Sequence, residues 1–157
     1  MEIFTSEISI FKGKPSANSN ELLYKGQILV KDNHAEGIMI DQDNNSYFIF
    51  GNFIKFGNID LILPLNDTTL IFNGRKGLYT YNGMYTKHKN NQIIEEDSFY
   101  LKELGLNFDP REIDSENPNP IISFEEELEP FKQLWLSNPN NQMILEYYLN
   151  KNNTKRL

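Results

Sequence analysis

The chain has no cysteine, which excludes disulfide bonds, thiolate metal ligands and cysteine nucleophiles. It also has no apolar run that approaches the roughly 20 residues of a membrane-spanning helix. Residues 1–7 lack the basic and then apolar stretches of a secretory signal. The two histidines, His34 and His88, have no sequence-local partner suited to metal binding or general-base catalysis. These absences predict a cytoplasmic protein with no cofactor, no metal, no catalytic site and no membrane partner.

Acidic side chains are concentrated in the second part of the chain. The net charge is −7, yet residues 1–89 balance nine Lys/Arg against nine Asp/Glu. Residues 90–157 carry six basic and thirteen acidic side chains, and twelve of these acids fall within residues 95–129. Such a field repels phosphates, so nucleic-acid binding is not expected, whereas a basic protein partner would be attracted. A solvated connector that binds nothing is the alternative interpretation.

An aromatic residue, one spacer and then a glycine recur in the first half of the chain. The motif occupies residues 11–13, 24–26, 72–74 and 81–83. Aromatic rings suit a half-buried pleated surface, while glycine permits a bulge, a bend or a positive φ. The repetition therefore indicates a series of short antiparallel strands.

Alternating segments separated by Gly, Pro and Asn predict about eight strands within residues 1–89. Gly57 and Asn58 have the glycine-first order of a type II′ turn. Asn82 and Gly83, between two apolar segments, predict a two-residue type I′ hairpin loop. The spacing predicts an antiparallel β-meander that forms either a small barrel or a coiled sheet.

The pattern changes after residue 89. Residues 90–122 are polar and acidic and contain three prolines, so we interpret them as a connector with one short helix at residues 98–104. Residues 123–157 have helical periodicity and predict a pair of helices that packs on the β body or extends from it. The predicted fold class is mainly β, and α+β overall.

Each predicted C-terminal helix has an apolar stripe. The stripe of the first helix begins after a capping-box pattern at residues 123–126 and contains Phe124, Leu128, Phe131 and Trp135. The stripe of the second helix contains Met143, Ile144, Tyr147 and Tyr148.

The strand pattern over about residues 2–88 resembles the calycin architecture of lipocalins, fatty-acid-binding proteins and avidins. This resemblance implies an up-and-down barrel that holds a small apolar ligand. Gly26, Gly51 and Gly74 are spaced 25 and 23 residues apart, and in this respect the chain also resembles MORN-type repeats. That second resemblance implies a twisted open sheet used for protein contacts, including in some bacterial antitoxin-like proteins. The predicted tight hairpins favour the continuous meander of a calycin-like barrel.

Two sets of residues are candidates for binding. Phe48, Phe50, Phe53 and Phe56 either pack in the core or line a cavity for a small apolar ligand. The acids of the first predicted helix surround its last two aromatic residues; they are Glu125, Glu126, Glu127 and Glu129, around Phe131 and Trp135. If this helix docks, the aromatic residues cover the β body. If it does not dock, they become exposed anchors for a partner, and the acids steer that partner toward them.

These patterns predict a non-enzymatic protein-binding module, such as an immunity or inhibitor protein, whose acidic surface engages a basic partner. The alternative is a calycin-like carrier of a small apolar ligand.

Overall fold

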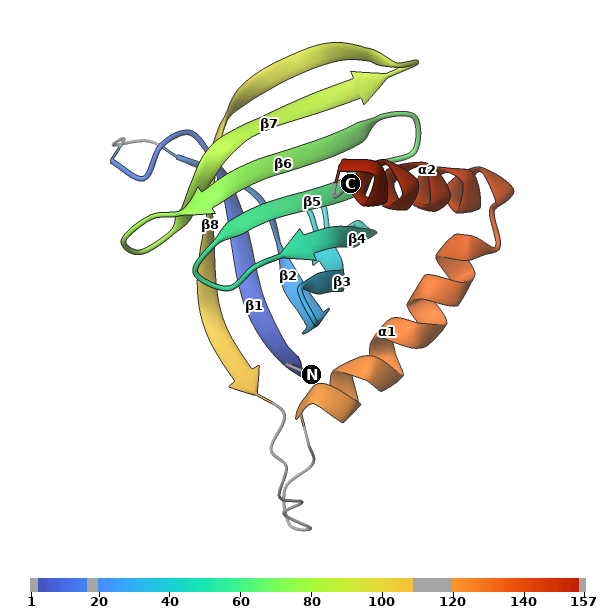
Figure 1. Cartoon of the computed structure of the whole chain (residues 1–157), viewed down its shortest axis with the longest axis horizontal. Helices are drawn as coiled ribbons and strands as arrows, with labels where there is room; N and C mark the ends of the chain where they lie inside the picture. Colours follow the sequence, from blue (N-terminus) through green and yellow to red (C-terminus); the bar gives the residue numbers. More distant parts are fainter. Residues whose placement is uncertain (1–2, 17–19, 109–119, 156–157) are drawn as a thin grey trace.

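The computed structural model describes residues 3–16, 20–108 and 120–155, in which eight strands precede two helices (Figure 1). The strands are β1 Ile3–Lys12, β2 Glu21–Lys31, β3 His34–Ile40, β4 Ser46–Phe53, β5 Asn58–Pro64, β6 Thr69–Lys76, β7 Tyr81–Lys89 and β8 Gln92–Phe108. The helices are α1 Pro120–Leu136 and α2 Pro139–Lys155. Neither described helix is long and apolar enough to cross a membrane. The predicted order of a β-meander followed by two helices is confirmed.

The eight strands form a closed barrel. Each strand pairs antiparallel with the next, and β1 also pairs antiparallel with β8, so that Ile10 lies opposite Leu101 and Lys12 lies opposite Phe99. The register shifts once in this last pairing, between Glu7 and Ile8. Closure leaves no free sheet edge. Of the two predicted alternatives, a barrel and a coiled sheet, the chain forms the barrel.

The strand that closes the barrel, β8, lies in residues that the sequence predicts to be an acidic connector. The short helix predicted at residues 98–104 is wrong. Phe99 and Leu101 are buried in the barrel, while Tyr100 lies between them on the opposite face and stacks on Phe11, with ring centroids 4.9 Å apart. The side chains therefore alternate with the period of a strand.

The predicted hairpin loop at Asn82 and Gly83 is also wrong. Both residues lie within β7, and Gly83 pairs with Gly74 of β6. A Cβ atom on Gly83 would lie 1.9 Å from the carbonyl oxygen of Asn73, so this glycine permits close approach of two strands and does not make a turn. The turn between β6 and β7 lies earlier, where the Gly77 amide donates to the Thr80 carbonyl at 2.7 Å.

The β4–β5 turn differs from the predicted type II′ turn. Asn58 is the first residue of β5, and the loop is closed by hydrogen bonds from the Ile54 amide to the Asn58 carbonyl at 3.0 Å and from the Gly57 amide to the Ile54 carbonyl at 2.9 Å. Phe56 takes the left-handed conformation with a φ of 64°. A phenylalanine therefore occupies a backbone position that usually favours glycine.

The interior of the barrel is a packed core to which all eight strands contribute. Aromatic rings meet there across strands, with centroids 5.1 Å apart for Phe72 and Phe99 and 5.0 Å apart for Phe53 and Tyr81. The buried residues of this inner core are Phe4, Ile8, Ile10, Ile28, Val30, Ala35, Met39, Ile49, Phe53, Ile59, Leu61, Leu63, Leu70, Phe72, Tyr81, Tyr85, Phe99 and Leu101.

A second core lies between the outer wall of the barrel and the helices. Its buried residues come from β2, β4, β5 and α1; they are Leu29, Phe48, Phe50, Ile62, Ile121, Phe124 and Leu128. The strand β4 is consequently buried on both faces, as its continuous run of apolar residues predicts. Docking of α1 on the barrel thus depends on the apolar side chains that face outward from these strands.

Two leucines of α1 test whether the helix contributes to stability by docking. Leu128 is 3% exposed and Leu134 is 73% exposed. We expect Leu128→Ala to lower the free energy of unfolding by about 2–5 kcal/mol, because it leaves a cavity against the barrel. Leu134→Ala removes the same atoms from an exposed position and is expected to change it by less than about 0.5 kcal/mol. Urea unfolding followed by circular dichroism measures both, and equal effects would contradict the docked arrangement.

Candidate protein-binding surface

The apolar stripe of α1 faces the barrel. Phe124 and Leu128 are buried, and Phe131 and Trp135 are half-buried against the same core. The Trp135 ring lies 4.7 Å from the ring of Phe48 and 6.1 Å from that of Phe50. Of the two predicted arrangements, the structure shows the one in which this helix docks on the β body. Phe131 and Trp135 are engaged in internal packing and are not exposed anchors for a partner.

The corner between α1 and α2 is held by side-chain amides. Asn141 Nδ2 donates to the Trp135 carbonyl at 2.8 Å, and Gln142 Nε2 donates to the Leu136 carbonyl at 2.9 Å. These bonds satisfy carbonyl groups that have no partner within α1, because they belong to its last turn. Asn138 caps α2, since its Oδ1 accepts from the Asn140 amide at 3.0 Å. The helical pair is thus a defined unit.

Docking divides the four predicted acids of α1 into two groups. Glu125 turns toward the barrel and pairs with Lys31 of β2 at 3.3 Å. Glu126, Glu127 and Glu129 are exposed. Glu126 lies on the side of α1 opposite the buried stripe, while Glu127 and Glu129 flank the stripe and line clefts against the barrel.

An exposed apolar residue, Leu134, lies on the same helix as these acids, and the sequence did not identify it as a binding residue. Leu134 is four residues after Pro130 and eight after Glu126, so the three share the outward side of α1. The one sequence feature that could have indicated its exposure is that Leu134 does not belong to the apolar stripe of the helix. We call the exposed residues Glu126, Glu127, Glu129 and Leu134 the acidic helical face.

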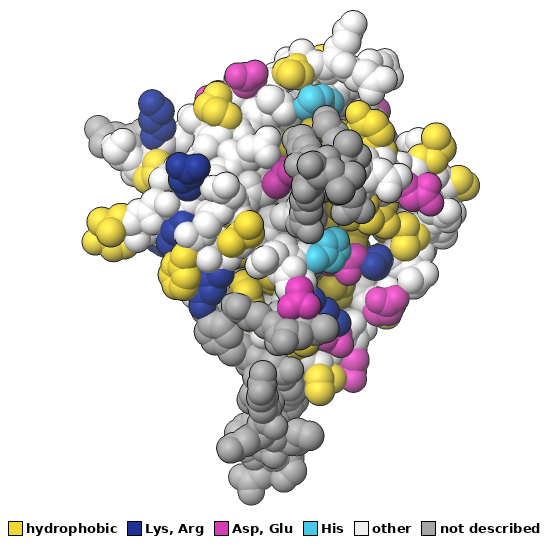
Figure 2. Space-filling model, in the orientation of Figure 1, with side chains coloured by type: hydrophobic (Ala, Val, Ile, Leu, Met, Phe, Trp, Pro, Cys, Tyr) yellow, Lys and Arg dark blue, Asp and Glu magenta, His cyan; other side chains and the backbone are white. Residues whose placement is uncertain are grey.

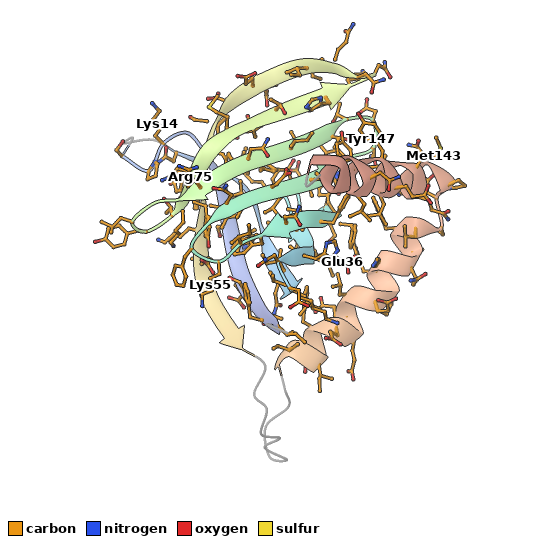
Figure 3. The ribbon with its side chains drawn as sticks, viewed as in Figure 1. Lys14, Glu36, Lys55, Arg75, Met143 and Tyr147 are labelled. Atoms are coloured by element: carbon orange, nitrogen blue, oxygen red, sulfur yellow. The ribbon has the colours of Figure 1, made fainter. Side chains whose placement is uncertain are left out.

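The predicted stripe of α2 is only half correct. Ile144 and Tyr148 pack against the outer wall of the barrel, whereas Met143 and Tyr147 are exposed. Figure 3 shows Met143 and Tyr147 on α2, at the edge of the molecule away from Lys14, Lys55 and Arg75. The two adjacent pairs at 143–144 and 147–148 cover a wide arc of the helix, and only contact with the barrel decides which part of that arc is buried.

Acidic and basic side chains are segregated on the face of the molecule that Figure 2 shows. In Figure 2, Asp and Glu lie mostly over the helical side of the molecule, while Lys and Arg are grouped on the side of the β4–β5 and β6–β7 loops. Two cations near the acidic helical face, Lys31 and Lys132, are engaged in ion pairs with Glu125 and Glu36.

A cleft of 190 Å³ lies between α1 and the β2–β3 hairpin. Glu36 is its central charge: Lys132 Nζ of α1 is 2.5 Å from Glu36 Oε2, and His34 Nε2 is 3.9 Å from the same oxygen. Burial raises the pKa of Glu36, but contacts with His34 and Lys132 outweigh burial and bring this pKa below its ordinary value. Figure 3 shows Glu36 between the barrel and α1, so the ion pair fastens the helix to the barrel.

The two histidines contact different side chains. His34 Nε2 lies 3.9 Å from the Glu36 carboxylate, which Lys132 also contacts. His88 Nε2 lies 2.8 Å from the Thr86 hydroxyl. Within the described part of the chain, no group of three or more His, Asp or Glu side chains could hold a metal ion.

The four phenylalanines predicted to line one cavity lie in three different environments. Phe48 and Phe50 face outward beneath Trp135, Phe53 faces the interior of the barrel, and Phe56 is exposed on the β4–β5 loop. Of the two expectations, core packing describes Phe48, Phe50 and Phe53. A cavity shared by all four does not fit, because the three-residue step from Phe50 to Phe53 reverses the face of the strand and Phe56 lies in a loop.

The Glu36–Lys132 pair leads to a pH-dependent prediction. The folded-state pKa of Glu36 is lowered, so its contribution to stability is present above the unfolded-state pKa and is lost as the pH falls through the folded-state pKa. We expect Glu36→Gln to lower the free energy of unfolding at neutral pH by about 1–3 kcal/mol. The difference from wild type should vanish in acid, which urea unfolding across a pH series measures.

The more exposed Glu125–Lys31 pair supplies the control. Glu125→Gln is expected to change the free energy of unfolding by less than about 1 kcal/mol at neutral pH. A Glu36→Gln effect that stays constant across the pH series would show that Glu36 does not act through its charge.

Comparison with known proteins identifies no relative: no protein-family model, curated protein or solved structure matches the chain. The function proposed for it therefore depends on the geometry of its own surfaces.

Proposed function

We propose that the chain is a non-enzymatic protein-binding module, of the immunity or inhibitor type, whose acidic helical face engages a basic partner. One observation carries this proposal. The helix α1 buries most of its apolar stripe against the barrel and leaves Glu126, Glu127, Glu129 and Leu134 exposed.

The way α1 is held favours binding. Apolar packing, the Glu36–Lys132 ion pair and the amides at the α1–α2 corner fasten the helix along its length. A surface that is already ordered loses little conformational entropy when a partner binds. The exposed acids would raise the association rate of a basic partner by electrostatic steering.

An apolar contact is also needed, because rim charges alone contribute more to rate and specificity than to affinity. Leu134 offers such a contact, since it is exposed and lies on the same side of α1 as Glu126. The proposed binding residues are therefore the predicted acids of α1 other than Glu125. Leu134 is the proposed apolar anchor, in place of Phe131 and Trp135. The partner would present a basic groove with a small apolar pocket.

The carrier alternative receives no support from the packing. The interior of the barrel is filled by side chains from all eight strands, and Trp135 covers Phe48 and Phe50 on the outside. A ligand among these rings would have to displace residues that now pack against one another.

Charge reversal tests the protein-binding proposal. We expect Glu126→Lys/Glu129→Lys to weaken binding of the basic partner by about tenfold or more, mainly through slower association, because like charges then face each other. The partner is first captured on the immobilised chain from an extract of the source organism, identified by mass spectrometry and purified. Surface plasmon resonance at low and high salt then measures both rates.

The matched control is Glu21→Lys/Glu96→Lys, which changes the net charge by the same amount at two exposed positions of the barrel. This control should leave binding within about twofold of wild type, since its charges lie outside the interface. Leu134→Ser should accelerate dissociation. Equal loss of binding in the control and in the α1 variant, or capture of no basic protein, would refute the proposal.

A further inference from the structure

One end of the barrel exposes four large apolar side chains on two loops. Ile54 and Phe56, in the β4–β5 loop, are 43% and 75% exposed. Leu78 and Tyr79, in the β6–β7 loop, are 83% and 82% exposed. Figure 1 shows both loops projecting on the side of the barrel away from the helices. Internal packing of the fold does not use these four side chains to any large extent.

The two loops are joined to each other and to the core. The Lys76 amide donates to the Gly57 carbonyl at 2.9 Å, which holds the loops side by side. The Phe56 amide donates to the hydroxyl of buried Tyr81 at 3.1 Å. The loops are therefore attached to the core of the barrel at a defined point.

The backbone of Phe56 is unusual for its residue type. Its φ of 64° is disfavoured for a bulky side chain, and the Tyr81 hydroxyl holds it there. This conformation directs the ring into solvent. An aromatic ring that is 75% exposed adds little apolar burial to the fold, which points to a use of the ring in binding.

Cations are interleaved with these apolar residues. Lys55 Nζ lies 5.2 Å from the centre of the Phe56 ring, and Lys76 Nζ lies 4.9 Å from that of Tyr81. Arg75 is exposed and donates to Asn58 Oδ1 at 3.3 Å. Residues 54–58 and 73–82 contain no acid. Figures 2 and 3 show Lys and Arg grouped with apolar side chains on this side, where Lys55 and Arg75 are labelled.

We propose that this end of the barrel binds the surface of an anionic lipid bilayer. We call it the barrel tip and define it by Ile54, Lys55, Phe56, Arg75, Lys76, Leu78 and Tyr79. Phe56, Leu78 and Tyr79 enter the interfacial region, where aromatic and apolar side chains are favoured. The three cations meet the headgroup phosphates. The chain then lies on the bilayer and does not span it.

The shape and charge of the tip favour a bilayer over an acidic protein. The apolar side chains project from separate loops, and a fluid bilayer admits such projections without a matching pocket for each one. The distribution of charge also sets the orientation. The acidic helical face lies on another side of the molecule, so an anionic surface attracts the tip and repels the helices.

A second pair of exposed apolar residues differs from the barrel tip in the charge of its neighbours. Ile93 and Ile94 are 56% and 54% exposed, but Glu95 and Glu96 follow them directly, and both acids are exposed. An anionic bilayer would repel this pair. The sequence expectation of no membrane partner depends on the absence of a spanning segment, and the barrel tip would bind without one.

Co-sedimentation of the full chain with vesicles tests the proposal. We expect binding to vesicles of phosphatidylcholine mixed with phosphatidylglycerol, little binding to phosphatidylcholine alone, and weakening with salt. Phe56→Asn/Leu78→Ser/Tyr79→Ser should weaken binding by at least about tenfold, because it removes the apolar contacts. It should also fold normally, since asparagine tolerates the left-handed backbone and the other two sites are exposed.

Two further variants complete the test. Lys55→Gln/Arg75→Gln should weaken binding by roughly fivefold for each charge removed. The matched control Ile93→Ser/Ile94→Ser should bind as wild type does. Absence of binding to the anionic vesicles, or equal loss in the control, would overturn the proposal. Binding of poly-glutamate through the same residues, without vesicle binding, would overturn it in favour of an acidic protein partner.

Discussion

Pairing of β1 with β8 is the constraint on which the rest of the structure depends. It closes the sheet and so decides which side chain of each strand faces the interior. Once the interior is filled, the aromatic residues Phe48 and Phe50 of β4 are left on the outer wall. Exposed there, they would form an apolar patch of the kind that promotes association. The helix α1 covers them, and its position follows from closure of the barrel.

Closure also separates the two surfaces to which we assign binding. The acidic helical face lies on α1, which is fastened by apolar packing and by the Glu36–Lys132 pair. The barrel tip lies on loops that Tyr81 ties to the core. Both surfaces are held by buried groups, which limits the entropy lost on binding. Since they occupy different sides of the molecule, a basic protein and an anionic bilayer could be bound at the same time.

The sequence was most informative where one periodicity was unambiguous. Alternation predicted the meander, the continuous apolar run of β4 predicted burial of both its faces, and helical spacing predicted α1 and its apolar stripe. The prediction failed where residues satisfied two patterns. Residues 98–104 fit a short helix as well as a strand, and pairing with β1 and β7 selects the strand. Asn82 and Gly83 fit a turn, yet the turn forms at Gly77 and Thr80.

By itself, the sequence determined the order of β and α elements, the excess of acid after residue 89 and the exclusion of cysteine chemistry. Those properties depend on composition or on residues a few positions apart. Only the tertiary structure decided that the barrel closes, that α2 packs Ile144 against the barrel and exposes Met143, and that Lys132 meets Glu36. The physical reason is that each of these outcomes is a contact between segments distant in sequence, which local periodicity does not specify.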